Sequence, residues 1–190
     1  MEYIYHIAVL FCLYGILTVS FNLLVGFTGM FALSHAALYA IGAYTTAILA
    51  TDFGIPFPLD MIASVLVAAV ISAVIALPAL RGTGHYLVIV SLALQIIVLQ
   101  VILNWKSLTR GSDWISPDRF LIVALIALAA CYWFTHRLVR SPFGRGLRAM
   151  RENESAAQAV GLNILYMKLS TFAISAALAA VAGSLFARYF

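Results

Sequence analysis

Long runs without Asp, Glu, Lys or Arg constrain this chain more than any other feature. These runs cover residues 3–25, 30–50, 61–80, 86–105, 120–136 and 169–187. A helix rises about 1.5 Å per residue, so roughly 20 apolar residues cross a hydrocarbon core about 30 Å thick. Residues 65–71 are continuously apolar, whereas the strands of a membrane barrel alternate. The sequence therefore predicts an all-α, polytopic transmembrane helix bundle with about six spans.

The composition excludes most other classes of protein. Hydrophobic residues make up 64% of the chain and charged residues 9%, whereas soluble domains carry roughly 25% charged residues. Soluble, secreted disulfide-rich and disordered proteins are therefore excluded. Cys12 and Cys131 both fall in predicted spans, where packing is a more plausible role than a disulfide or a metal site. The predicted spans contain no acidic residue, which argues against a proton-coupled carrier.

The basic residues between the spans set the expected orientation. Five arginines separate the fifth and sixth spans: Arg137, Arg140, Arg145, Arg148 and Arg151. Cytoplasmic loops carry the excess of Lys and Arg, so this connection is predicted to be cytoplasmic, Arg81 to lie inside and the N-terminus outside. Residues 26–29 are either a turn between two helices or a break within one discontinuous helix. A break would reverse the side of the N-terminus.

The arginine-rich connection has the pattern of an ordered helical element. Ser141 followed by Pro142 is a typical helix start, and Asn153 can cap a second helix over residues 154–160. Gly161 fits the stop position, where a positive φ is needed. One interpretation is that the arginines only fix topology and bind anionic headgroups. The caps and the adjacent alanines Ala156 and Ala157 favour a surface for a protein partner.

Small residues recur every four positions in the last predicted span, at Ser175, Ala179, Gly183 and Ala187. Such stripes let helix backbones approach closely in lipid, where little hydrophobic force drives helices together. The given sequence ends at Phe190, so we expect another subunit, or C-terminal sequence beyond it, to cover this face.

Polar residues inside the spans are candidates for a translocation path, because they are costly in hydrocarbon. The candidates are Asn22, Ser34, His35, Gln95 and Gln100. His35 has an alternative role as a hydrogen-bonding residue between helices. Gly26 and Gly29 could supply unwound backbone to the path, as in discontinuous transporter helices, or simply form a turn. Ser34 and His35 diverge by about 100° on a helix, so they do not form a catalytic dyad.

The arginine-rich loop resembles a known family. The segment RSPFGRGLRAMRENE from Arg140 to Glu154, followed by Ala156-Ala157 and Gly161-Leu162-Asn163, is similar to the cytoplasmic loop of bacterial branched-chain amino acid ABC transporter permeases, M-type more than H-type. NLLVG from Asn22 and LSHAA from Leu33 are similar as well. The resemblance covers essentially residues 15–190.

The resemblance implies a multi-pass permease subunit of the bacterial cytoplasmic (inner) membrane. It implies one permease domain over residues 1–190, incomplete at the C-terminus, with a coupling loop at residues 137–165. The partners would be two cytoplasmic ABC ATPase subunits, a second permease subunit and an extracytoplasmic solute-binding protein, with no nucleic acid. The residues expected to dock on the ATPase are Arg145, Arg148, Arg151, Glu152, Asn153, Glu154, Ala156, Ala157 and Gly161.

The expected function is ATP-driven import of branched-chain or similar small amino acids. The chain has no G-x-x-x-x-G-K-[ST] phosphate loop, so it is not expected to be an enzyme or to bind a cofactor or metal. ATP and Mg²⁺ are expected in the partner ATPase. The expected path residues are Asn22, Gly26, Gly29, Ser34, His35 and Gln95. The alternative is a stand-alone channel or secondary carrier, which would not need an ordered arginine-rich platform.

Overall fold

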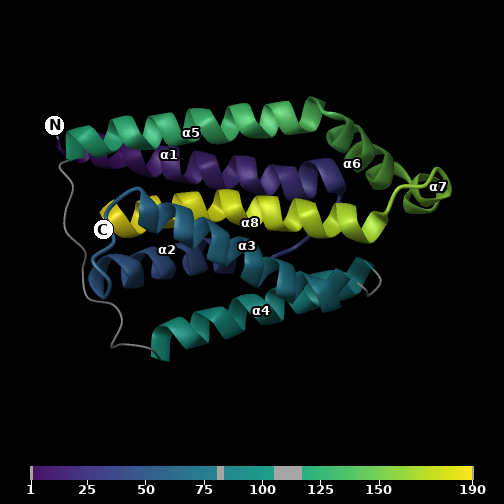
Figure 1. Cartoon of the computed structure of the whole chain (residues 1–190), viewed down its shortest axis with the longest axis horizontal. Coiled ribbons are helices and arrows are strands. Elements are labelled where there is room, and N and C mark those ends of the chain that lie inside the picture. The colour runs from purple at the N-terminus through teal and green to yellow at the C-terminus, as the bar shows by residue number, and fades with distance from the viewer. Residues whose placement is uncertain (1, 81–83, 105–116, 190) are drawn as a thin grey trace.

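The computed structural model describes residues 2–80, 84–104 and 117–189, and all regular secondary structure in this part of the chain is helical (Figure 1). The long helices are α1 (Glu2–Asn22), α2 (His35–Thr51), α3 (Leu59–Leu80), α4 (Gly84–Asn104), α5 (Pro117–Arg140) and α8 (Ile164–Tyr189). A π-helical turn, η1 (Leu23–Phe27), extends α1, and the short helices α6 (Pro142–Glu152) and α7 (Glu154–Ala159) join α5 to α8. The predicted all-α bundle is confirmed. Arg81 lies outside the described residues.

Consecutive long helices run in opposite directions along the bundle (Figure 1). The start of α1 and the end of α8 therefore lie at one end, and α6 and α7 project from the other. This order is the alternation that the predicted topology requires. Gly26 and Phe27 belong to the π-helical turn η1, and from Gly29 an irregular segment leads to the antiparallel α2, so the structure shows a connection between two antiparallel helices.

Four stretches of the described residues are long and apolar enough to cross a membrane. They are Tyr3–Phe27, Leu59–Leu77, Phe120–Arg140 and Ile164–Tyr189. α2 has 17 residues, and the described apolar part of α4 is the shorter stretch Val88–Val101. Length and composition thus support four of the predicted spans, while α2 and α4 lie beside them in the same bundle.

α8 occupies the centre of the bundle, where it packs against α2, α3 and α1. The contact with α2 is backbone to backbone: a Cβ added at Gly42 would lie 2.5 Å from Ala180 Cα, and one added at Gly183 would collide with the Tyr39 carbonyl. Ser175, Ala179 and Gly183 are consequently buried within this chain. The expectation that another subunit or later sequence covers this stripe is wrong for these three residues, because α1 packs on Ser175 and α2 on Gly183.

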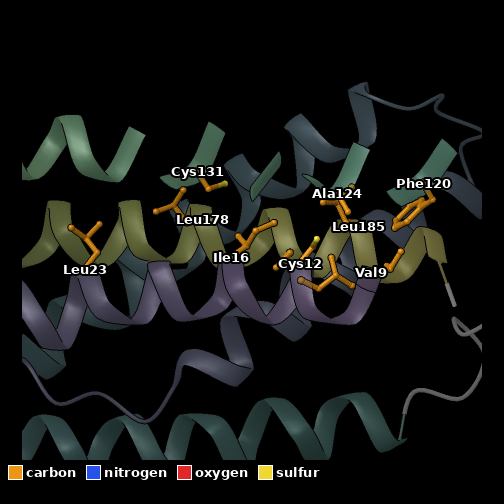
Figure 2. Close-up of a cluster of buried hydrophobic side chains, with 11 residues drawn as sticks. Val9, Cys12, Ile16, Leu23, Phe120, Ala124, Cys131, Leu178 and Leu185 are labelled. Atoms are coloured by element: carbon orange, nitrogen blue, oxygen red, sulfur yellow. The ribbon is translucent and has the colours of Figure 1, made fainter. Parts of the chain in front are cut away.

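A cluster of apolar side chains joins α1, α5 and α8 (Figure 2). Ile16 of α1 and Leu185 of α8 are almost fully buried, as is Phe120 at the start of α5. Cys12 and Cys131 lie within the same cluster as free, buried residues, as expected for packing residues. Dispersion contacts of this kind hold helices together in lipid.

An ion pair ties α3 to the end of α8. Asp60 is fully buried in the first turn of α3, and its Oδ2 lies 2.7 Å from Nη2 of Arg188 and accepts a hydrogen bond from Arg188 Nε at 2.8 Å. Arg188 also donates to the Ile55 carbonyl. The inference that no span contains an acidic residue is therefore wrong, because the apolar helix begins at Leu59 and includes Asp60 in its first turn.

Candidate coupling element and translocation path

The connection between α5 and α8 folds as the caps predict. The Ser141 hydroxyl accepts a hydrogen bond from the Gly144 amide, with Pro142 at the first helical position. Asn153 ends α6 and starts α7, where its side chain accepts a hydrogen bond from the Ala156 amide at 3.0 Å. Gly161 has a φ of +86°. Helix, cap, helix and glycine stop therefore follow one another as expected.

α6 and α7 are packed onto the bundle by a small apolar core. Leu147 and Met150 of α6 are almost fully buried against Ala157 of α7 and Met167 of α8. A Cβ added at Gly146 would lie 2.5 Å from Met167 Cε. The prediction that Ala157 belongs to the exposed docking surface is wrong, because this side chain faces the small core.

The three arginines predicted to face the ATPase separate into different roles. Arg148 donates from Nη2 to the Val139 carbonyl at 3.2 Å and so satisfies the end of α5. Arg151 donates from Nη1 to the Gly26 carbonyl in η1. Arg145 is exposed, and its side chain has no hydrogen bond or ion pair with the described residues. Only Arg145 is fully available to a partner.

The acidic residues separate in the same way. Lys168 Nζ of α8 lies 2.6 Å from Glu154, so Glu154 ties α7 to the bundle. Glu152 is exposed and has no ion pair within the described part of the chain. Seven residues separate it from Arg145, so both lie on one side of α6. We call Arg145 and Glu152, together with the exposed Ala156 of α7 and the exposed Val160 that follows this helix, the docking face.

The junction between α1 and α2 is held by contacts that only glycine allows. Gly29 has a φ of +71°, in the left-handed region, and its amide donates to the Val25 carbonyl at 3.1 Å. A Cβ added at Gly29 would lie 3.1 Å from Arg151 Cγ. The Arg151 side chain therefore bonds Gly26 and contacts Gly29. The structure joins two sets of residues, coupling and path, that the sequence analysis treated separately.

Beyond Gly29 the chain runs back into the bundle without helical structure until α2 begins at His35. Ala32 and Ser34 are buried, and the Leu33 amide donates to Ser91 Oγ of α4 at 2.9 Å. Irregular backbone at membrane depth is tolerated only where protein buries it or where it lines a cavity. The sequence analysis missed Ser91, because a single serine in an apolar helix carries no signal of its distant partner.

His35 lies near the middle of the long helices. Its ring centroid is 5.4 Å from that of Phe21, and the neighbouring Ser20 hydroxyl donates at 2.6 Å to the carbonyl of Ser175, which is about halfway along α8. A histidine starting α2 here places the amide end of that helix inside the bundle. The positive end of the helix dipole is thus at membrane depth.

The polar atoms of Ser34 and His35 are buried without partners. Ser34 is 1% exposed and His35 7%, and neither Ser34 Oγ nor either ring nitrogen of His35 has a hydrogen bond with any residue of the described ranges. A buried polar atom without a partner costs about 1–3 kcal/mol. The described residues thus do not support the interpretation that His35 forms a hydrogen bond with a neighbouring helix.

The remaining predicted path residues lie elsewhere. Asn22 is exposed and lines a pocket of about 220 Å³ between α1 and α5. Gln95 is half-buried on α4, whose contact with the irregular segment is made instead by Ser91, four residues earlier. Ser34 and His35 therefore lie together inside the bundle, while Gly26 and Gly29 lie beside Arg151 of α6.

Comparison with known proteins identifies the lineage of the chain. The family described as "Branched-chain amino acid transport system / permease component" matches residues 3–190. The chain belongs to this family. It is therefore a non-catalytic, multi-pass membrane permease component, which confirms the resemblance carried by the arginine-rich loop.

Individual relatives of this permease chain agree with that result. The high-affinity branched-chain amino acid transport system permease protein LivM of Escherichia coli K12 is 34% identical over 95% of the chain and 51% of its own length. LivM of Salmonella typhimurium is 33% identical with the same coverage, and LivH of that organism is 25% identical over 93% of the chain and 67% of its own length. The chain thus spans about half the length of the LivM relatives. No solved structure matches it.

Proposed function

We propose that this permease chain forms part of an ATP-driven importer for branched-chain or similar small amino acids. Two cytoplasmic ABC ATPase subunits would drive it. The complete transporter would also contain a second permease subunit and an extracytoplasmic solute-binding protein. The observation that carries the proposal is the hydrogen bond from Arg151 of α6 to the Gly26 carbonyl. It connects a helical element at one end of the bundle to the turn that leads to His35.

The ATPase would contact the docking face. Arg145 and Glu152 offer opposite charges without partners in the described chain, and Ala156 and Val160 offer small apolar side chains beside them. Such a mixture gives electrostatic complementarity at the edge of an interface and apolar contact within it. The small core under α6 and α7 would hold the two helices together rigidly enough to transmit a movement of the ATPase.

Motion of α6 would reach the path through Arg151. Its planar guanidinium donates a hydrogen bond to the Gly26 carbonyl. The Cγ atom of the same side chain packs beside Gly29. A shift of α6 would therefore move the turn, and with it the irregular segment that ends at Ser34. Hinges in switching proteins are loop residues of this kind, which absorb the change in φ and ψ.

The substrate would meet Ser34 and His35. An amino acid carries a carboxylate, which accepts hydrogen bonds from a hydroxyl, from an imidazole N–H and from free amides at a helix N-terminus. Discontinuous helices of other transporters direct such ends at anionic substrate groups. The carboxylate would accept from the hydroxyl and the imidazole N–H, and the ammonium group of the same amino acid would donate to the other ring nitrogen; these three atoms lack partners among the described residues.

The test of the proposal is retention of the ATPase. The chain is co-expressed with candidate ATPase subunits, and Glu152→Arg is expected to abolish their co-purification while membrane insertion is unchanged. The matched control is Asp52→Arg, the same change of charge at an exposed position beyond α2, at the opposite end of the bundle. Full ATPase retention by Glu152→Arg, or import that continues without ATP, would refute the proposal.

A further inference from the structure

A pocket of about 430 Å³ opens where α5 meets α6. Its lining residues are Trp133, His136, Arg137, Arg140 and Ser141. Trp133, Arg137 and Arg140 follow one another at spacings of four and three positions, so they lie along one side of α5. None of the five belongs to the docking face or to the path through Ser34 and His35.

The two arginines of the pocket carry charges that the described residues leave unneutralised. The ion pairs in this part of the chain involve Arg188 and Lys168, not Arg137 or Arg140. The guanidinium carbon of Arg137 lies 5.8 Å from the centroid of the Trp133 ring, within the range of a cation–π interaction. The ring restrains one cation, and the second lies one helical turn further on. Two such groups suit the geometry of a phosphate.

The same side of α5 continues as an apolar stripe toward the other end of the helix. Ile122, Ile126 and Trp133 are 59%, 64% and 63% exposed, and their spacing of four and seven positions aligns them with Arg137. The stripe lies within the apolar stretch Phe120–Arg140, and the pocket lies at its end. Tryptophan and arginine are typical of the boundary between hydrocarbon and headgroups.

We propose that this pocket binds the phosphate group of an anionic phospholipid. The guanidinium groups of Arg137 and Arg140 bind the phosphate, and the acyl chains lie along Ile122 and Ile126. Inorganic phosphate offers the same oxygens, but it would leave the apolar stripe unused, so the lipid is the better fit. The proposal does not depend on which solute is carried or on which ATPase binds.

The test uses Trp133 as the reporter. The chain contains three tryptophans, so Trp105→Phe and Trp114→Phe leave Trp133 alone. The full chain is placed in nanodiscs of phosphatidylcholine and phosphatidylglycerol, with bromine on the acyl chains of one lipid or the other. At equal mole fraction, brominated phosphatidylglycerol is expected to quench Trp133 fluorescence more strongly than brominated phosphatidylcholine.

The preference for the anionic lipid should depend on the pocket arginines. Each arginine near a membrane surface contributes roughly a fivefold preference, so Arg137→Gln with Arg140→Gln should lower the relative affinity about 25-fold. Arg145→Gln removes an exposed arginine from α6 outside the pocket and should leave the preference unchanged. Quenching by brominated phosphatidylcholine should rise in the double variant, because phosphatidylcholine then takes the site, and its persistence in every variant shows that α5 remains exposed to lipid.

Several results would overturn the proposal. Equal quenching by the two lipids, or a preference that survives the double substitution, would show that the pocket arginines do not select the lipid whose phosphate carries an unneutralised negative charge. Loss of the preference in Arg145→Gln would assign it to the general charge of this end of the bundle. Loss on addition of inorganic phosphate, but not of chloride at equal ionic strength, would identify free phosphate as the ligand. Absence of quenching by either lipid would mean that protein covers this side of α5.

Discussion

The contact of Arg151 with η1 cannot be predicted from the residues next to it in the sequence. Arg145, Arg148 and Arg151 are spaced identically, yet they contact solvent, the end of α5 and η1 respectively. The spacing predicts a helix and a basic surface, and both are present. The distribution of roles depends on what lies beside α6 in space, and no local pattern encodes that.

Arg151→Ala should uncouple the element without detaching it. The ATPase would still bind the docking face, but the hydrogen bond to Gly26 would be lost. A hydrogen bond to a charged group is worth about 1.5–3 kcal/mol, so import per ATP hydrolysed should fall by roughly tenfold or more. Transport and hydrolysis are measured together in proteoliposomes. Arg148→Ala, which loses contacts with α5 and α6 instead, should affect coupling far less; equal defects in both variants would contradict the assignment.

His35→Leu should separate stability from transport. Replacing a buried, unpartnered imidazole with an apolar side chain removes a desolvation cost, so the chain should become more stable by about 1–3 kcal/mol. Import should nevertheless fall, because a donor to the substrate is lost. Ser91→Ala is the counterpart with the opposite sign, since it leaves the Leu33 amide without its partner. Thermal unfolding in detergent and uptake assays provide the two readouts, and a destabilised His35→Leu would argue against the path.

At the scale of elements, α6 and α7 form a compact unit whose helix ends are fixed by the chain's own side chains. Asn153 serves both helices, since its backbone amide donates to the Ala149 carbonyl at the end of α6 and its side chain caps α7. Caps, glycine stops and apolar runs were predictable because they act over a few residues. The burial of Ala157 was not predictable, because it depends on the approach of Met167 from α8.

Asn153→Ala should loosen α7 while leaving the bundle intact. Loss of an N-cap costs about 1 kcal/mol, which should raise the rate of amide exchange in α7 about fivefold. Hydrogen exchange followed by mass spectrometry measures this for residues 154–160. Ser155→Ala, a neighbouring exposed serine for which the structure shows no side-chain hydrogen bond, is the control. Unchanged exchange in Asn153→Ala would mean that packing on α8, not the cap, holds α7.

At the scale of the whole molecule, the position of α8 could not be read from the sequence. Uncharged runs show which segments are long enough to span a membrane, because that depends only on local composition. Both α2 and α8 carry small residues along one side, but the spacing of these residues does not show which helix each side packs against. The close contact of Gly42 with Ala180 decides the arrangement, and the pair Asp60–Arg188 closes it at one end.

Breaking the Asp60–Arg188 pair should destabilise the whole bundle. Asp60→Leu leaves a largely buried guanidinium without its carboxylate, a change that typically costs about 3–5 kcal/mol. Asp60→Leu combined with Arg188→Met should recover much of the loss, since replacing both charges removes the unpaired ion. Thermal unfolding of the purified chain measures both, with Asp52→Leu, an exposed acid nearby in sequence, as the control. A double variant as unstable as the single one would contradict this account.

The central place of α8 has a consequence for biogenesis, because α8 follows every helix that it joins. While the nascent chain leaves the ribosome, α1 to α5 enter the bilayer before the helix that holds them together exists. The side of α2 that carries Gly42 therefore remains exposed to lipid until α8 is inserted. Chains stalled before Ile164 should therefore be recognised by membrane proteases far more readily than chains released after Tyr189.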